Sequence, residues 1–295
     1  MEQREPEQAP ILVAFNALVD DREPVEFGVA AQRVTGASLL IVSGRDGEDD
    51  VAGTLDELRQ DLERRGVDAE VRVHEGGSPA DMVVEAVAEL RPGLVVLGST
   101  RRGKLRSALR GTTIEPVIQR AGCPVAIVPR GYQPPPKGVR RIGVAYAPTH
   151  EGRSALRFAA GLARAGSTAL RAILVLGPEL DGADAPPEVA GLREQLALFG
   201  EGLDAGADVV FGDPAEMIVG VSDQFDLLVI GSRSRSGRRA VMFGSVSRAV
   251  AERSACPVVV LPGGSAEAAG EFVTHVVGQR PSGEGQPRAS VDDGG

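Results

Sequence analysis

CPVAIVPRG, residues 123–131, returns as CPVVVLPGG at residues 256–264, and this recurrence decides how the chain folds. The two stretches lie 133 residues apart. At the same offset, twelve of the 34 positions in 98–131 are identical to their counterparts in 231–264, where unrelated stretches would share about two. Self-similarity over this length predicts a tandem duplication of one domain.

The start of each copy is marked by a second pair of similar stretches. PILVAF at 10–15 resembles RIGVAY at 141–146. A proline run in RGYQPPPKG favours an extended spacer between the copies, and the sequence after Pro262 has no apolar periodicity. The expected segments are an N-terminal extension at 1–8, a first domain at 9–131, a linker at 132–139, a second domain at 140–264 and a disordered tail at 265–295.

Within each copy, apolar runs alternate with helical patterns. In the first copy the expected strands are ILVAF, SLLIVSG, AEVRVHEG, GLVVLGS and PVAIVP. The second copy repeats this plan with a shorter second helix and a brief middle strand, ADVVFG at 207–212. Strands with nearly continuous apolar runs, separated by helices, predict an α/β fold in which both faces of a parallel sheet are covered. Right-handed crossovers make each sheet doubly wound.

A doubly wound sheet binds ligands outside the carboxyl ends of its strands, at the switch point. Here the switch point lies at the ends of the first and fourth strands. A phosphate needs closely approaching backbone N–H groups and a helix N-terminus, which glycines and hydroxyl residues favour. Equivalent sets follow the fourth strands: Gly231, Gly244 and Ser245 in the second copy, and Gly98, Gly111 and Thr112 in the first. An ordinary strand-to-helix turn also favours these residues, so both interpretations stay open.

Charges at the two helix starts differ between the copies. Arg248 falls in the first turn of its helix, where a cation opposes the helix dipole unless a bound anion or solvent screens it. In the first copy, Thr112 and Glu115 fit a T-x-x-E capping box. A carboxylate at that place would repel a phosphate, so the first copy is less suited to binding one.

Each copy resembles a universal stress protein (UspA) domain, and together they are similar to the tandem form found in actinobacteria. The resemblance covers about residues 9–264. It rests on GSRSRSGRRAVMFGSVSRAVAERSACPVVVLP at 231–262 and GSTRRGKLRSALRGTTIEPVIQRAGCPVAIVP at 98–129. It implies a flavodoxin-like or Rossmann-like sheet of five parallel strands in the order 3-2-1-4-5. It also implies pairing through the last strands, which makes an internal pseudo-dimer and leaves open a homodimer of chains.

The ATP-binding members of this family carry G-x-x-G, nine residues, then G-[ST], with an aspartate at the end of strand one. In the second copy Ser234 replaces the second glycine, and in the first copy Arg101 does. The aspartate is replaced by Asn16 in the first copy and by Ala147 in the second. Asn16 can still form a hydrogen bond, whereas Ala147 cannot. Neither copy therefore keeps the full motif.

Two functions are compatible with these residues. The first is a stress-response protein in which ATP, a related nucleotide or another small phosphorylated ligand occupies at least one cleft. The candidate ligand-binding residues are Asn16, Gly98, Arg101, Gly111 and Thr112 in the first copy and Ala147, Gly231, Ser234, Gly244, Ser245 and Ser247 in the second. The second is a tandem scaffold that binds no nucleotide and acts through an unknown protein partner. Ser245 and Ser247 have no base near them in sequence, and no P-loop lysine motif is present, so we expect no enzyme, although weak nucleotide hydrolysis stays open.

Other features point away from further chemistry. The net charge of −9 argues against nucleic acid as a partner. His74, His150 and His275 show no metal-ligand spacing, and Cys123 and Cys256 are expected to be buried thiols. No apolar run reaches the roughly 18 residues that a membrane span needs, and the charged N-terminus does not resemble a signal peptide. We expect a cytoplasmic protein without a metal.

Overall fold

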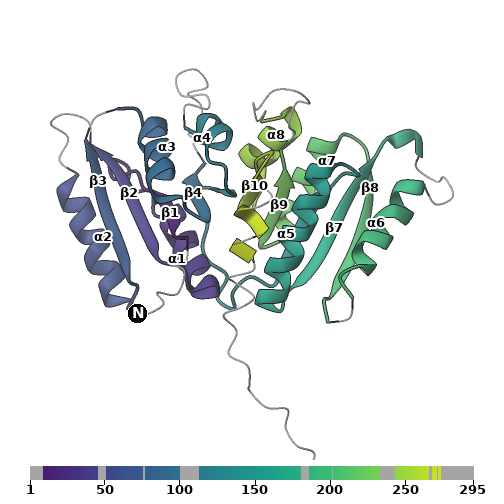
Figure 1. Cartoon of the computed structure of the whole chain (residues 1–295), viewed down its shortest axis with the longest axis horizontal. Helices are drawn as coiled ribbons and strands as arrows, with labels where there is room; N and C mark the ends of the chain where they lie inside the picture. Colours follow the sequence, from purple (N-terminus) through teal and green to yellow (C-terminus); the bar gives the residue numbers. More distant parts are fainter. Residues whose placement is uncertain are drawn as a thin grey trace, which may run out of the picture.

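One ten-stranded sheet runs through both halves of the chain, as the computed structural model shows (Figure 1). The structure describes residues 9–45, 51–75, 77–99, 113–180, 186–200, 202–232, 243–265, 268–270 and 272–273. The first domain supplies β1 (Ile11–Ala14), β2 (Leu39–Arg45), β3 (Ala69–Glu75), β4 (Leu94–Gly98) and β5 (Val125–Val128). The second supplies β6 (Arg141–Tyr146), β7 (Ala169–Leu176), β8 (Ala205–Phe211), β9 (Leu227–Gly231) and β10 (Val258–Leu261).

Helices connect the strands and begin where the sequence offers start signals. The first domain holds α1 (Glu23–Thr35), α2 (Ala52–Arg64), α3 (Pro79–Leu90) and α4 (Ile114–Arg120). The second holds α5 (His150–Gly166), η1 (Pro178–Leu180), α6 (Pro187–Ala197), α7 (Pro214–Gly220), η2 (Ser222–Gln224) and α8 (Ser245–Arg253). Ser78 caps α3 by accepting the N–H of Asp81, and Pro79 occupies the first helical position, as predicted. Gly36 ends α1 with a φ of 71°.

The strand order confirms the predicted topology. It reads β3-β2-β1-β4-β5 in the first domain and β8-β7-β6-β9-β10 in the second, which is 3-2-1-4-5 twice. All pairs within a domain are parallel, while β5 and β10 pair antiparallel with Ala126 opposite Val259. These two residues are 133 positions apart, the offset of the repeat, so a local two-fold axis passes between them. The two domains therefore form the expected internal pseudo-dimer.

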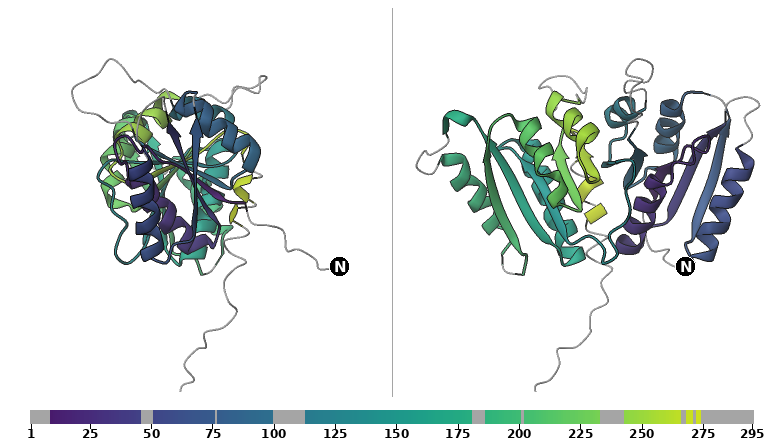
Figure 2. Two further views of the ribbon diagram at one scale, coloured as in Figure 1. Left: turned by 90° about the vertical axis from the view of Figure 1, so that its left-hand side faces the viewer. Right: turned by 180° about the vertical axis from the view of Figure 1, so that it is seen from behind.

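Two apolar cores lie on opposite faces of the sheet, because successive strand residues point to opposite sides. Ile11 and Val13 join the core beneath α1, α2, α5 and α6, whereas Leu12 between them joins the core beneath α3, α4, α7 and α8. Each core contains residues of both domains. Figure 2 shows these helix layers from two further sides. The sheet is therefore covered on both faces, as the apolar runs predict.

The segment after residue 264 differs from the predicted disordered tail. Ser265, Ala269 and Phe272 are buried, and the Phe272 ring stacks on Phe158 of α5 with centroids 6.3 Å apart. A Cβ on Gly93, in the first domain, would lie only 2.6 Å from Phe272 Cδ2. This segment lies between the two domains (Figure 1, yellow). Disorder is thus wrong for these residues, and 274–295 lie outside the described residues.

Two element boundaries also differ from expectation. β8 has seven residues, the same length as β3, because it begins at Ala205 and pairs with β7 along its whole length. Pairing with a neighbour extends a strand beyond its most apolar residues. α4 begins at Ile114 rather than at Thr112, which lies outside the described residues.

Candidate functional site

The carboxyl edge of the second domain brings together five of the predicted ligand-binding residues. Gly231 ends β9, and α8 begins at Ser245 after Gly244. The Ser247 hydroxyl donates to the Gly231 carbonyl oxygen at 3.2 Å, which fixes the first turn of α8 against the end of β9. β6 lies beside β9, so Ala147, which follows β6, lies at the same edge.

Among the described residues, no side chain caps the N-terminus of α8. Gly244 occupies the N-cap position in extended conformation, with φ −67° and ψ 163°. A Cβ built on Gly244 meets no atom of the described residues within 4 Å. The first N–H groups of a helix lack intrahelical partners and carry the positive end of the dipole. This start is therefore able to accept an anion.

The helix on the other side of Gly231 is capped by the protein itself. Thr149 Oγ1 accepts the N–H of Gly152 at 3.1 Å, at the start of α5. A Cβ on Gly231 would lie 2.8 Å from the backbone oxygen of Glu151, so only glycine allows α5 to approach β9 this closely. The cleft thus has one satisfied helix start and one open one.

Ser232 adds an unsatisfied polar atom next to Gly231. Its side chain is fully buried, and its Oγ has no hydrogen-bond partner in the described part of the chain. A buried hydroxyl without a partner is uncommon in folded proteins. Sequence reasoning did not single out Ser232, because a serine after a strand resembles any other turn residue.

The sequence left two partners open for the Arg248 cation, a bound anion or screening solvent, and the structure shows a third. Arg248 Nη2 donates to Glu115 Oε2 at 2.6 Å, and its guanidinium lies 5.4 Å from the Phe243 ring centroid. A carboxylate of the first domain, rather than a ligand or solvent, therefore balances this cation. The predicted capping box does not fit this helix start: Thr113 is the N-cap, so Glu115 is the second helical residue rather than the third, and Thr112 lies outside the described residues.

The first-domain cleft contains a carboxylate that the sequence did not indicate. The Asp21 carboxylate lies against Gly98 so closely that a Cβ there would overlap Asp21 Oδ2. Asn16, the candidate for the base side of this cleft, accepts the N–H of Leu18 at 3.2 Å through Oδ1. The Asn16 carbonyl accepts the N–H of Asp21, which folds the loop back towards the end of β4. Arg101, Gly111, Thr112 and, in the second domain, Ser234 lie outside the described residues.

Burial and a neighbouring acid change the titration of this carboxylate. Burial, together with the hydrogen bond and charge of Glu23, raises the pKa of Asp21 to about 7. Burial also tends to raise the pKa of Glu23. Its hydrogen bonds with Asp21 and with the N–H of Gly131 outweigh this effect, so the pKa of Glu23 is lowered overall. The two carboxyl groups share a proton and titrate as a pair. When both are ionised, they oppose a phosphate at Gly98.

We expect an Asp21→Asn variant to be less sensitive to alkaline pH than the wild type. The folded pKa of Asp21 lies above its unfolded value, so its favourable contribution is present at low pH and is lost as pH rises through about 7. Between pH 5 and pH 8, the free energy of unfolding of Asp21→Asn should rise relative to that of the wild type. Because the carboxyl is part-exposed, we expect this rise to be on the order of 1 kcal/mol. Urea unfolding at both pH values measures it. Asp20→Asn, at the exposed neighbour, is the control, and equal pH dependence in all three proteins contradicts the expectation.

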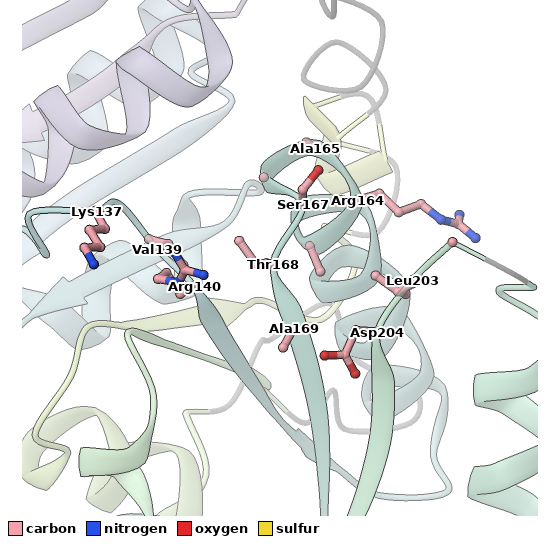
Figure 3. Close-up of a pocket in the computed structure, with 13 residues that line it drawn as sticks. Lys137, Val139, Arg140, Arg164, Ala165, Ser167, Thr168, Ala169, Leu203 and Asp204 are labelled. Carbon is pink, nitrogen blue, oxygen red and sulfur yellow. The ribbon is translucent and has the colours of Figure 1, made fainter. Parts of the chain in front are cut away.

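A cavity lies at the opposite edge of the second domain (Figure 3). It has a volume of about 640 Å³ between the linker at Lys137 and Arg140, the end of α5, and the start of β8. Arg164 points away from it and donates to the Phe199 carbonyl, while Asp204 accepts from Arg171. A doubly wound sheet binds ligands at its carboxyl edge. This cavity is therefore not part of the predicted cleft.

The remaining reactive side chains show no catalytic or metal-binding arrangement in the described ranges. Cys123 and Cys256 are buried free thiols, and burial raises the pKa of each to about 12. His74 Nε2 lies 2.9 Å from Glu85 Oε2 on an exposed edge, and His150 is exposed at the start of α5. No group of three potential metal ligands occurs in the part of the chain that the structure describes. Within the same residues, every helix is too short or too polar to cross a membrane.

Comparisons with known proteins agree with this architecture. The model of the Universal stress protein family matches residues 28–129 and 138–262. A universal stress protein of Mycobacterium tuberculosis is 31% identical over 197 residues, which are 62% of this chain. That match spans 65% of the relative, slightly less than two thirds of its length.

Solved structures share the fold at lower identity. A universal stress protein from Archaeoglobus fulgidus has a TM-score of 0.60 at 20% identity, over 86% of this chain and 96% of its own. A putative universal stress protein from Pseudomonas aeruginosa has a TM-score of 0.65 at 18% identity, over 90% of this chain and 98% of its own. At these identities the likeness concerns the fold alone.

Proposed function

This chain belongs to the universal stress protein family, and on that premise we propose that it is a stress-response protein whose second domain binds the phosphate groups of an ATP-type nucleotide. The single observation that supports this most is the open N-terminus of α8, held beside Gly231 by Ser247. Helix starts of this kind bind phosphate through backbone N–H groups and the dipole, without needing a lysine. The buried Ser232 hydroxyl beside them is a further group that a ligand or an ordered water can satisfy.

The two domains are proposed to differ in their ligand preference. In the first domain, Asp21 and Glu23 place negative charge at Gly98, and α4 has only seven residues. In the second domain, the side chain of Ala147 supplies no acceptor for a base or ribose, so the phosphates carry most of the recognition there. We therefore assign the phosphate site to Gly231, Gly244, Ser245 and Ser247. We propose binding without hydrolysis, in the cytoplasm.

The proposal predicts that wild-type protein binds a nucleotide and that Gly244→Asp weakens this binding while the fold stays intact. Aspartate is a good N-cap residue, and a Cβ at this position meets no atom of the described residues within 4 Å. Its carboxylate would occupy and repel the phosphate position. Isothermal titration with ATP, ADP, AMP and cyclic AMP measures the effect, and we expect a loss of at least about tenfold in affinity, or roughly 1.4 kcal/mol.

Gly244→Asn is the matched control, because it caps the helix without a charge and should keep more of the affinity. If none of the four nucleotides gives heat at high micromolar concentration, the nucleotide site is refuted. The alternative function, a scaffold that binds no nucleotide, is favoured if the 260 nm absorbance of a denatured, filtered sample is also absent. Turnover of ATP above a blank, lost in Gly244→Asp, would instead indicate hydrolysis.

A further inference from the structure

The contact between Glu115 and Arg248 joins equivalent positions of the two domains. The residues are 133 positions apart, the offset of the repeat, and they sit in the equivalent helices α4 and α8. These helices lie side by side at the centre of the molecule (Figure 1). A residue that touches its own counterpart lies on the local two-fold axis. The same axis passes between Ala126 and Val259 in the sheet.

This position on the axis has a chemical consequence. If two copies of the first domain paired in the same way, Glu115 would meet a second Glu115. If two copies of the second domain paired, Arg248 would meet a second Arg248. Only the unlike pair brings opposite charges together, at 2.6 Å in this chain. In a pair of identical domains, a residue on the two-fold axis meets its own copy. In this chain the two domains have different residues at that position, so a glutamate meets an arginine.

The strand pairing at the interface discriminates poorly between like and unlike pairs. The β5 and β10 stretches are CPVAIV and CPVVVL, and their backbone pairing is symmetric about Ala126 and Val259. Unpaired sheet edges accept any compatible strand. The strands alone therefore do not select the partner domain, and side chains around them must contribute: Phe272 packs against both domains, and the charged pair on the axis adds a contact that depends on sign.

The surroundings of the pair increase its influence. The side chains of Arg248 and Glu115 are 37% and 35% exposed, so water only partly screens them. The Phe243 ring covers one side of the guanidinium, and Gln119 Nε2 donates to Glu115 Oε1 at 3.3 Å. Like charges held in this place would be both close and incompletely hydrated.

We propose that Glu115 and Arg248 determine which domains pair, so that the β5–α4 edge accepts the β10–α8 edge and rejects a second copy of itself. Specificity is a difference in affinity, and repulsion in the wrong pair contributes as much as attraction in the right one. The linker between the domains then favours pairing within one chain by raising the effective concentration. The pair thereby keeps both sheet edges covered internally.

The test uses charge reversals in the full chain. Glu115→Arg places two arginines on the axis, Arg248→Glu places two glutamates there, and the double variant exchanges the charges. We expect each single reversal to lower the melting temperature by about 2–4 °C, the effect of about 1 kcal/mol in a chain of this size. The double variant should recover most of this loss. If it is no more stable than the single variants, the two residues are not coupled and the proposal fails.

A mixing experiment tests selection directly. Glu115→Arg chains carry arginine at both axis positions and Arg248→Glu chains carry glutamate, so only pairs between different chains attract. After refolding together at roughly 100 μM, below the millimolar effective concentration of a short linker, a mixed two-chain species should appear in light scattering. Wild type refolded with the double variant should give none, because each chain is satisfied internally. The absence of any mixed species from the first mixture would overturn the proposal.

Glu216→Arg provides a matched control away from the axis. Glu216 forms an equally short pair with Arg253, at 2.6 Å between α7 and α8 inside the second domain. Its reversal should lower stability without creating a mixed species with Arg248→Glu. A mixed species in this control would show that chain exchange follows destabilisation in general, which would also overturn the proposal.

Discussion

Replacing Phe272 with alanine is expected to lower the free energy of unfolding by about 3–5 kcal/mol, the usual loss for a buried phenylalanine. The side chain is 5% exposed and stacks on Phe158 of α5, which is itself buried. It also fills the space beside Gly93 at the start of β4. The ring therefore contacts both domains, and its removal leaves a cavity that neither domain can close alone.

Urea unfolding of Phe272→Ala measures this loss, with Leu198→Ala as the control. Leu198 is 77% exposed, so its truncation should change stability by less than about 0.5 kcal/mol. Phe272→Leu should fall between the two, because it keeps part of the apolar volume. A Phe272→Ala variant as stable as the control would show that this segment is not packed in solution.

Phe272 also illustrates where the sequence stops being informative. The repeat fixes the fold, because strand runs and helix starts recur at one offset and each copy has the pattern of a doubly wound sheet. Phe272 has no counterpart in the first copy and stands in a stretch rich in Ala, Gly and Glu. Composition predicts disorder there. Its burial depends on a groove that exists only once the two domains have paired.

The sequence likewise predicts only part of the candidate site. Gly231, Gly244, Ser245 and Ser247 come together as the motif indicates, because the connection from strand four to the helix is local in sequence. Asp21 was missed, since a pair of acidic residues in a loop resembles any solvated turn. The side chain reaches Gly98 only because the Asn16 carbonyl turns the loop back.

Replacing Gly152 with alanine is expected to lower the free energy of unfolding by about 3 kcal/mol, at the upper end of overpacking effects. A Cβ here would overlap the carbonyl oxygen of Ala147 and lie 2.9 Å from its nitrogen. Both atoms are backbone, so no change of side-chain rotamer relieves the overlap. Thermal and urea unfolding measure the loss. An outcome within 0.5 kcal/mol of wild type would contradict the packing.

Gly191→Ala is the matched control, because Gly191 lies inside α6 and a Cβ there meets no atom of the described residues within 4 Å. Alanine is a better helix former, so this variant should gain about 0.5–1 kcal/mol. The two glycine-to-alanine changes should thus alter stability in opposite directions, because backbone atoms of Ala147 lie next to Gly152 and no such atoms lie next to Gly191 among the described residues. Glu151, the residue before Gly152 in α5, lies against Gly231. Gly152→Ala should therefore also weaken nucleotide binding at α8, whereas Gly191→Ala should leave it unchanged.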